Sequence, residues 1–171
     1  MVDPVFAAAQ NLADALAQKR QRIVFAESCT AGLVSATLAR IAGISEWHCG
    51  AAVVYRLDTK QRWLGISAAM LDDPGPVSQD VAHAMAISVL ERTPEANYAA
   101  AVTGHLGPNV PFEQDGLVWV AIAKRQASGI AVIASVSQRL LASADEGLTV
   151  RETRQRAAAR AVFELVTPFI S

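Results

Sequence analysis

Ser28 is the residue whose place in the sequence first points to chemistry. It follows a short apolar run, Ile23 to Phe25, and precedes a stretch of helical periodicity over 33–41. A serine at a helix start lies among backbone N–H groups that have no partner within the helix, and such groups suit an oxyanion or a phosphate. More often, a serine in this place only caps the helix. The sequence shows neither a Gly-x-Ser-x-Gly elbow nor a Ser-x-x-Lys pair here, so spacing alone leaves both interpretations open.

Cys29 and the histidines are the other side chains that could carry chemistry. A thiolate at a helix N-terminus has a lowered pKa, so Cys29 is an alternative nucleophile, but no histidine follows at a spacing that identifies a base. We expect Cys29 to pack in the core. His48, His83 and His105 show no spacing typical of zinc ligands, so no metal site is expected. His48 and His83 are expected to be structural or surface residues.

Helices and strands that could position these residues alternate early in the chain, and two strands adjoin later. Helices are predicted over 4–19, 33–41, 78–92 and 148–165. A further helix, which Asp58 could cap, is predicted to contain Lys60. Strands are predicted over 23–25, 51–55, 98–103, 116–123 and 130–136. The intervening segment 104–115 is rich in Gly, Pro and Asn and reads as a loop. This order predicts an α/β fold, a three-layer α/β/α sandwich with a mixed, mostly parallel sheet, as one domain over 1–171.

Charge and hydropathy exclude several classes of partner. The chain has 15 Lys and Arg against 16 Asp and Glu, so no net field attracts nucleic acid or an acidic membrane surface, and neither partner is expected. No apolar stretch reaches the roughly 18 residues of a membrane span, and the first residues lack the pattern of a secretory signal. Two cysteines without Cys-x-x-Cys spacing are typical of a reducing compartment. We therefore expect a cytoplasmic protein.

Several short motifs, in one order along the chain, resemble a single family. The segment Ala26-Glu27-Ser28-Cys29-Thr30-Ala31-Gly32 is similar to the Ala-Glu-Ser-Cys-Thr-Gly-Gly motif that opens the nicotinamide-nucleotide amidase family, the family of the CinA C-terminal domain. Further matches are Ala42 to Ser45, Val54-Tyr55 with Lys60, Gly75 to Ser78, Ala101 to Gly104 with Gly107-Pro108, and Gly116 to Ala121. The resemblance thus extends over nearly the whole chain.

The resemblance implies an amide hydrolysis, from nicotinamide mononucleotide to nicotinate mononucleotide and ammonia, with no metal and no cofactor. It assigns Ser28 as the nucleophile, Lys60 as its general base and Tyr55 as the group that orients or relays the proton. Because an ordinary lysine has a pKa of about 10.4, this role requires that Lys60 be buried. The implied substrate-binding residues are Thr30, Ala31 and Gly32, whose N–H groups would stabilise the oxyanion, with Ser45, Thr103, Gly104, His105 and Gly107.

The sequence departs from the family at positions that would contact the substrate. Residues 103–110 lose two glycines of the family's Thr-Gly-Ile-Ala-Gly-Pro-Gly-Gly loop and gain His105. Gly147 stands where the family has the arginine of its Gly-Asp-Arg segment. If that arginine holds the substrate phosphate, an anionic mononucleotide should bind less well here, unless Arg56 restores the charge.

Two hypotheses follow for the function. The first is a retained amidohydrolase, acting on the nucleotide or on a shifted small-molecule substrate. The second is a catalytically inactive domain of the same fold that binds a small molecule or a protein. A Lys60 within hydrogen-bond reach of Ser28 favours the first, and a solvent-facing Lys60 favours the second. The sequence leaves open whether the protein forms a homodimer or a higher homo-oligomer, because an apolar helix face can pack equally well against a partner subunit or in the core.

Overall fold

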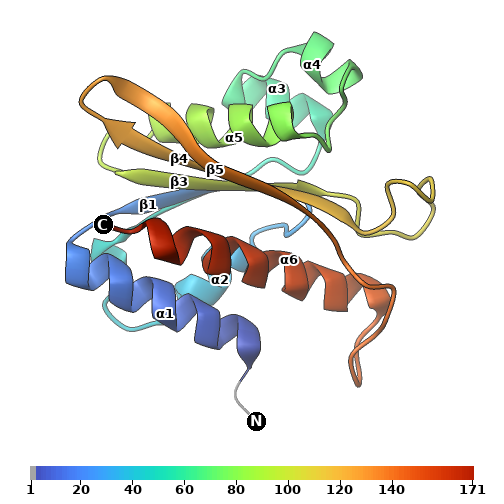
Figure 1. Cartoon of the computed structure of the whole chain (residues 1–171), viewed down its shortest axis with the longest axis horizontal. Helices are drawn as coiled ribbons and strands as arrows, with labels where there is room; N and C mark the ends of the chain where they lie inside the picture. The colour runs from blue at the N-terminus through green and yellow to red at the C-terminus, as the bar shows by residue number, and fades with distance from the viewer. Residues whose placement is uncertain (1–2) are drawn as a thin grey trace.

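A five-stranded β-sheet runs through the middle of the computed structural model, which describes residues 3–171 (Figure 1). The strands are β1 (Ile23–Glu27), β2 (His48–Val53), β3 (Tyr98–Gly104), β4 (Leu117–Gln126) and β5 (Gly129–Arg139). Their order across the sheet is β2-β1-β3-β4-β5, and β1 pairs in parallel with both β2 and β3. Only β4 runs against the others, because it is antiparallel to both β3 and β5. The prediction of a mixed, mostly parallel sheet is therefore confirmed.

Helices cover both faces of this sheet, as predicted. On one face lie α1 (Pro4–Lys19), α2 (Leu33–Leu38) and α6 (Val150–Val166), and on the other lie α3 (Leu57–Leu64), α4 (Ala68–Asp72) and α5 (Gln79–Glu91) (Figure 1). The short 3-10 helices are η1 (Ile44–Glu46) and η2 (Thr167–Phe169). Alternate residues of β1 point into the two layers, Ile23 and Phe25 into one core and Val24 into the other. This strand is buried on both faces, and it is accordingly apolar from Ile23 to Ala26, before the buried Glu27 at its end.

Three of the predicted helices begin at side-chain caps that the sequence provides. The Asp3 carboxylate accepts from the Val5 N–H at 3.0 Å, and the Ser78 hydroxyl accepts from the Val81 N–H at 3.3 Å. At α6 the Thr149 hydroxyl accepts from the Glu152 N–H while the Glu152 carboxylate accepts from the Thr149 N–H, a reciprocal capping box. These caps explain why the predicted helix starts lie within two residues of the observed ones.

The segment 44–72 differs most from the prediction. The second strand is His48–Val53 rather than 51–55, since its register with β1 pairs Ile23 with His48 and Glu27 with Val53. The next helix is capped at Arg56, whose N–H donates to the Thr59 hydroxyl, and not at Asp58. Other differences are that α2 ends at Leu38 instead of residue 41, that β4 and β5 each end three residues later than predicted, and that α4 was not predicted.

The parallel strands bring three loops to one edge of the sheet. The Ser28 N–H donates to the Val102 carbonyl at 3.0 Å, and the Val54 N–H donates to the Glu27 carbonyl at 2.8 Å. The segments that follow β1, β2 and β3 therefore start side by side, and ligands of open α/β sheets bind at this carboxyl edge. No helix within residues 3–171 has the length and apolar character needed to cross a membrane.

Gly104 allows β3 and β4 to approach closely at this edge. A Cβ on Gly104 would lie 2.3 Å from Val118 Cγ1 and 3.0 Å from the Leu117 carbonyl oxygen. We predict that Gly104→Ala lowers the free energy of unfolding by about 1–3 kcal/mol, because overpacking forces the strands apart. Urea denaturation measures the loss. In a Val118→Ala background the same substitution should cost less, and an equal cost in both backgrounds would contradict the steric explanation.

Candidate active site

A cavity of about 640 Å³ lies at the carboxyl edge of the parallel strands. Its walls come from Ser28 and Cys29 after β1, from most of 55–61 after β2, from 76–77 before α5, from most of 103–110 after β3, and from Arg151 of α6. The predicted residues Ser28, Tyr55, Lys60, Thr103, Gly104, His105 and Gly107 all line it. Segments far apart in sequence thus meet around one space of ligand size.

Ser28 and Lys60 are in direct contact at the base of this cavity. Lys60 Nζ lies 2.8 Å from Ser28 Oγ and 2.9 Å from the Val54 carbonyl oxygen. Lys60 is 2% exposed, so the predicted burial is confirmed, and among residues 3–171 it has no carboxylate partner. Burial lowers the pKa of Lys60 to about 8, because a charged ammonium is poorly solvated there. A substantial fraction of Lys60 is therefore neutral near physiological pH.

Glu27, the residue before Ser28, holds the turn that follows β1. Its side chain is fully buried, and its carboxylate accepts four hydrogen bonds. The donors are the Thr30 hydroxyl at 2.7 Å and the N–H groups of Gly32, Val34 and Ser35 at 2.9–3.1 Å. The carboxylate thus occupies the start of α2, where a negative charge is favourable. Glu27 belongs to the motif that resembles the family, but its role in holding the turn was not predicted from the sequence.

This arrangement corrects the expected role of Thr30, Ala31 and Gly32. The Gly32 N–H donates to Glu27, and the Ala31 N–H donates to the Ser28 carbonyl at 3.1 Å. Thr30 is fully buried, and none of the three residues lines the cavity. Ala31 has φ 53°, in the left-handed region where the family motif has glycine. These residues shape the turn, and the N–H groups of Ala31 and Gly32 are already occupied.

Tyr55 lines the cavity but makes no hydrogen bond to Ser28 or Lys60 in the described part of the chain. Its hydroxyl accepts a hydrogen bond from Arg151 Nη2 at 2.7 Å, and the residue is 53% exposed. Arg151 also donates to the Gly107 carbonyl. Arg151 was not predicted as a cavity residue. The only signal for it in the sequence is the pair Val150-Arg151, which resembles a Val-Arg pair of the family a few residues after the Gly-Asp-Arg segment.

The end of β3 and the loop after it form another part of the cavity wall. The Thr103 hydroxyl donates to the Pro76 carbonyl at 2.8 Å, which ties β3 to the segment before α5. His105 is half-buried, and burial lowers its pKa, so its ring is neutral near pH 7. Gly104 and Gly107 line the same wall with backbone atoms.

Two positions taken from the family resemblance lie outside the cavity. Ser45 is exposed in η1, which precedes β2 and so lies toward the amino edge of the parallel strands, whereas Ser28 follows the carboxyl end of β1. Gly147 is exposed before α6 and does not line the cavity either. Arg56 does line it, but its guanidinium pairs with Asp58 at 3.1 Å. Arg151, by contrast, lines the cavity and has no carboxylate partner among residues 3–171.

Cys29, the alternative nucleophile, and the histidines His48 and His83 lie in positions that indicate a structural role. Cys29 is buried, and burial raises the pKa of its thiol to about 12, which disfavours a thiolate. His48 Nε2 lies 2.7 Å from Ser35 Oγ, so it links β2 to α2. His83 Nε2 is buried in α5 without a partner among the described residues. Within 3–171, no cluster of three or more His, Cys, Asp or Glu side chains is placed to hold a metal ion.

These observations define an α/β/α domain with a buried Ser–Lys pair, Ser28 just after β1 and Lys60 on α3, that lines a ligand-sized cavity. Residues 6–166 match the sequence profile described as "CinA C-terminal domain". The chain belongs to the CinA C-terminal domain family.

Individual relatives agree with this assignment. A CinA-like protein of Prochlorococcus marinus (strain MIT 9312) is 42% identical over 110 residues, which cover 63% of this chain and 26% of that protein. A CinA-like protein of Mycobacterium sp. (strain JLS) is 41% identical over 114 residues, 67% of this chain and 27% of that protein. The matched segments thus span about a quarter of these relatives.

Solved structures share the fold over the full length of the chain. The competence/damage inducible protein CihA from Agrobacterium tumefaciens has a TM-score of 0.85 at 30% identity, with 100% of this chain and 98% of that one covered. A CinA superfamily protein from Klebsiella pneumoniae has a TM-score of 0.84 at 23% identity, with 97% of each chain covered. At 23% identity, the similarity to the Klebsiella pneumoniae protein shows a shared fold only.

Loss of the Glu27 charge tests the role of this carboxylate in the turn. Glu27→Gln should lower the free energy of unfolding by about 2 kcal/mol or more, because the new amide N–H₂ faces backbone donors and leaves them unsatisfied. Chemical denaturation followed by circular dichroism measures this change. The control is Glu164→Gln, which removes a solvent-exposed partner of Arg160 and should shift stability by less than about 0.5 kcal/mol. Equal effects of the two substitutions would contradict a structural role for the buried carboxylate.

Proposed function

We propose that this domain is a serine amidohydrolase that cleaves a small, non-peptide amide and releases ammonia, with nicotinamide mononucleotide as the candidate substrate. The observation that carries the proposal is the 2.8 Å contact between Ser28 Oγ and the buried Lys60 Nζ. The substrate assignment rests on the family resemblance, and the chemistry rests on this pair.

The pair supplies a nucleophile and a base. When Lys60 is protonated, Nζ donates to Ser28 Oγ and to the Val54 carbonyl. When Lys60 is neutral, the same separation lets the Ser28 hydroxyl donate to the lone pair of Nζ, and attack on the amide carbon transfers that proton to Lys60. The resulting ammonium can return the proton to the departing nitrogen, which leaves as ammonia. Water then hydrolyses the acyl-enzyme with Lys60 again as base.

A backbone donor for the oxyanion adjoins the nucleophile. Cys29 lines the cavity, and within residues 3–171 its N–H donates to no backbone carbonyl and to no side chain of another residue. The N–H of the residue after a nucleophile commonly contributes to an oxyanion hole. Gln155 of α6 donates to the Cys29 and Thr30 carbonyls at 3.4 and 3.1 Å and so holds this peptide segment. Cys29 therefore replaces Thr30, Ala31 and Gly32 as the proposed donor.

The charges on the cavity wall favour an anionic substrate. Arg56 is paired with Asp58, whereas Arg151 contacts a neutral hydroxyl and a carbonyl and has no carboxylate partner among the described residues. An arginine without an anionic partner suits a phosphate or carboxylate. This supports the nucleotide as a substrate despite the glycine at 147.

The alternative proposal is a domain of the same fold that binds a small molecule or a protein without catalysis. It derives from the altered loop 103–110, in which Asn109 and Val110 replace two glycines of the family pattern. The buried contact between Lys60 and Ser28 favours the hydrolase, since a lysine needed only for solubility would be exposed.

Removal of either member of the pair tests the mechanism. Ser28→Ala and Lys60→Met should each lower kcat for ammonia release from nicotinamide mononucleotide by about 10³-fold or more, because each removes a group that acts only in the chemical step. The matched control is Lys19→Met, an exposed lysine on α1, which should leave the rate unchanged. Wild-type protein that releases no ammonia from the nucleotide or from uncharged amides would support the binding domain instead.

The depressed pKa of Lys60 predicts the pH dependence of this activity. Because the base must be neutral, kcat/KM should rise about tenfold per pH unit below about pH 8 and level off above it. An initial-rate profile between pH 6 and 10 measures the inflection. A rate independent of pH over this range would contradict Lys60 as the base.

A further inference from the structure

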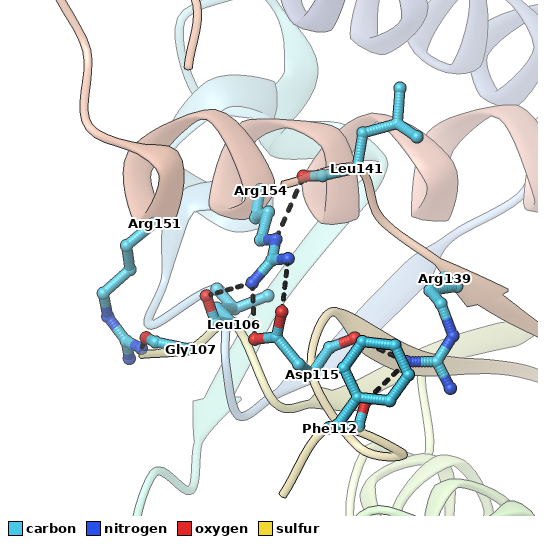
Figure 2. Close-up of polar contacts among 8 residues, drawn as sticks. All are labelled: Leu106, Gly107, Phe112, Asp115, Arg139, Leu141, Arg151 and Arg154. Atoms are coloured by element: carbon cyan, nitrogen blue, oxygen red, sulfur yellow. Dashed lines mark hydrogen bonds and ion pairs between the residues drawn. The ribbon is translucent and has the colours of Figure 1, made fainter. Parts of the chain in front are cut away.

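Three arginines of β5 and α6 hold the loop 105–115 that forms one wall of the cavity (Figure 2). Arg139 of β5 donates to the carbonyls of Phe112, Glu113 and Asp115. The two others, Arg151 and Arg154, lie one turn apart on α6. Two adjacent carbonyls of the loop, Leu106 and Gly107, are each bound by one of them.

Arg154 is the most buried of the three, with 4% exposed, and its guanidinium makes four hydrogen bonds within the protein (Figure 2). Nη1 and Nη2 each lie 2.8 Å from one oxygen of Asp115, a bidentate pair. Nε donates to the Leu141 carbonyl at 3.0 Å, and Nη1 donates to the Leu106 carbonyl at 3.1 Å. The hydrogen bonds from Arg154 hold the pKa of Asp115 below its ordinary value. Arg154 therefore joins both ends of the loop to α6.

The backbone of the loop fits closely around this ion pair. A Cβ on Gly107 would lie 2.6 Å from Asp115 Oδ1 and 2.9 Å from Arg154 Nη1, and Gly107 also has φ +68°. Only glycine fits this position without displacement of the pair. The carbonyl of the same Gly107 binds Arg151. The position of the ion pair is thereby coupled to that of Arg151.

We propose that the Asp115–Arg154 ion pair is a positioning element that fixes the loop 105–115 against α6, so that Arg151 faces the cavity and binds an anionic group of the substrate. Arg151 is the specificity-determining residue of this arrangement, and the ion pair acts through it. The inference rests on the proposed amidase only for the choice of ligand.

The charges of Asp115, Arg154 and Arg151 explain why the ion pair needs both of its members. Asp115 neutralises Arg154, which leaves Arg151 as the cavity arginine without a carboxylate partner among residues 3–171. Without the Asp115 charge, the buried Arg154 loses both charge-assisted bonds to this side chain, so the Asp115 end of the loop is released while α6 still binds the Leu106 and Gly107 carbonyls. The positions of Gly107 and Arg151 relative to Ser28 are then less firmly fixed.

The test measures binding, so it does not depend on turnover. Calorimetry in a Ser28→Ala background compares nicotinamide mononucleotide with nicotinamide riboside, which lacks the phosphate. Asp115→Asn should weaken binding of the mononucleotide about tenfold or more and change binding of the riboside less than about twofold. Arg151→Met should have the same selectivity. Once Arg151→Met is present, Asp115→Asn should add little further loss, because the ion pair acts through Arg151.

The matched control is Glu164→Gln, which removes an exposed i,i+4 ion pair of the same helix and should leave both affinities unchanged. Equal weakening of the two ligands by Asp115→Asn, or full additivity with Arg151→Met, would show that the pair serves stability alone and would overturn the proposal. Absence of saturable mononucleotide binding would overturn it as well. Selective binding without ammonia release by the wild-type chain would contradict the amidase and support the positioning role.

Discussion

The buried carboxylate of Glu27 is the constraint on which the geometry of the cavity depends. An anion without solvent requires several donors, and the turn after β1 supplies them by wrapping Thr30, Gly32 and the start of α2 around it. This turn fixes the direction in which Ser28 leaves the sheet. Lys60 is the opposite case, a buried cation without a carboxylate partner in the described chain. Its ammonium group therefore loses a proton more readily than that of an exposed lysine.

Local sequence signals were sufficient for most of the fold. Proline and cap residues located the starts of α1 and α5, and runs of apolar residues located β1 and β3. The strand β2 was misplaced by two to three residues because it lies at the edge of the sheet. Its bounds are set by pairing with β1, a long-range contact that local composition does not encode. The five-residue α4 is too short for a periodic pattern to reveal.

The candidate site was only partly predictable. Motifs near Ser28 and Lys60 identified residues that the structure brings together, since both lie just past parallel strands. The contribution of α6 could not be foreseen, because the packing of a distant helix against the sheet is what brings Arg151 to the cavity and Gln155 to the turn after β1. Ser45 fits a family motif, yet the topology places it toward the other edge of the strands.

The position of α6 in the chain also affects the order of folding. Its residues secure the turn after β1 through Gln155 and the loop after β3 through Arg154, while the helix itself spans Val150–Val166. During synthesis, the strands and the nucleophile leave the ribosome well before the helix that holds both loops. A chain that has emerged as far as residue 140 therefore contains Ser28 and Lys60 but lacks the hydrogen bonds from Arg154 and Gln155 to the two loops, so the site is completed only when the last helix docks.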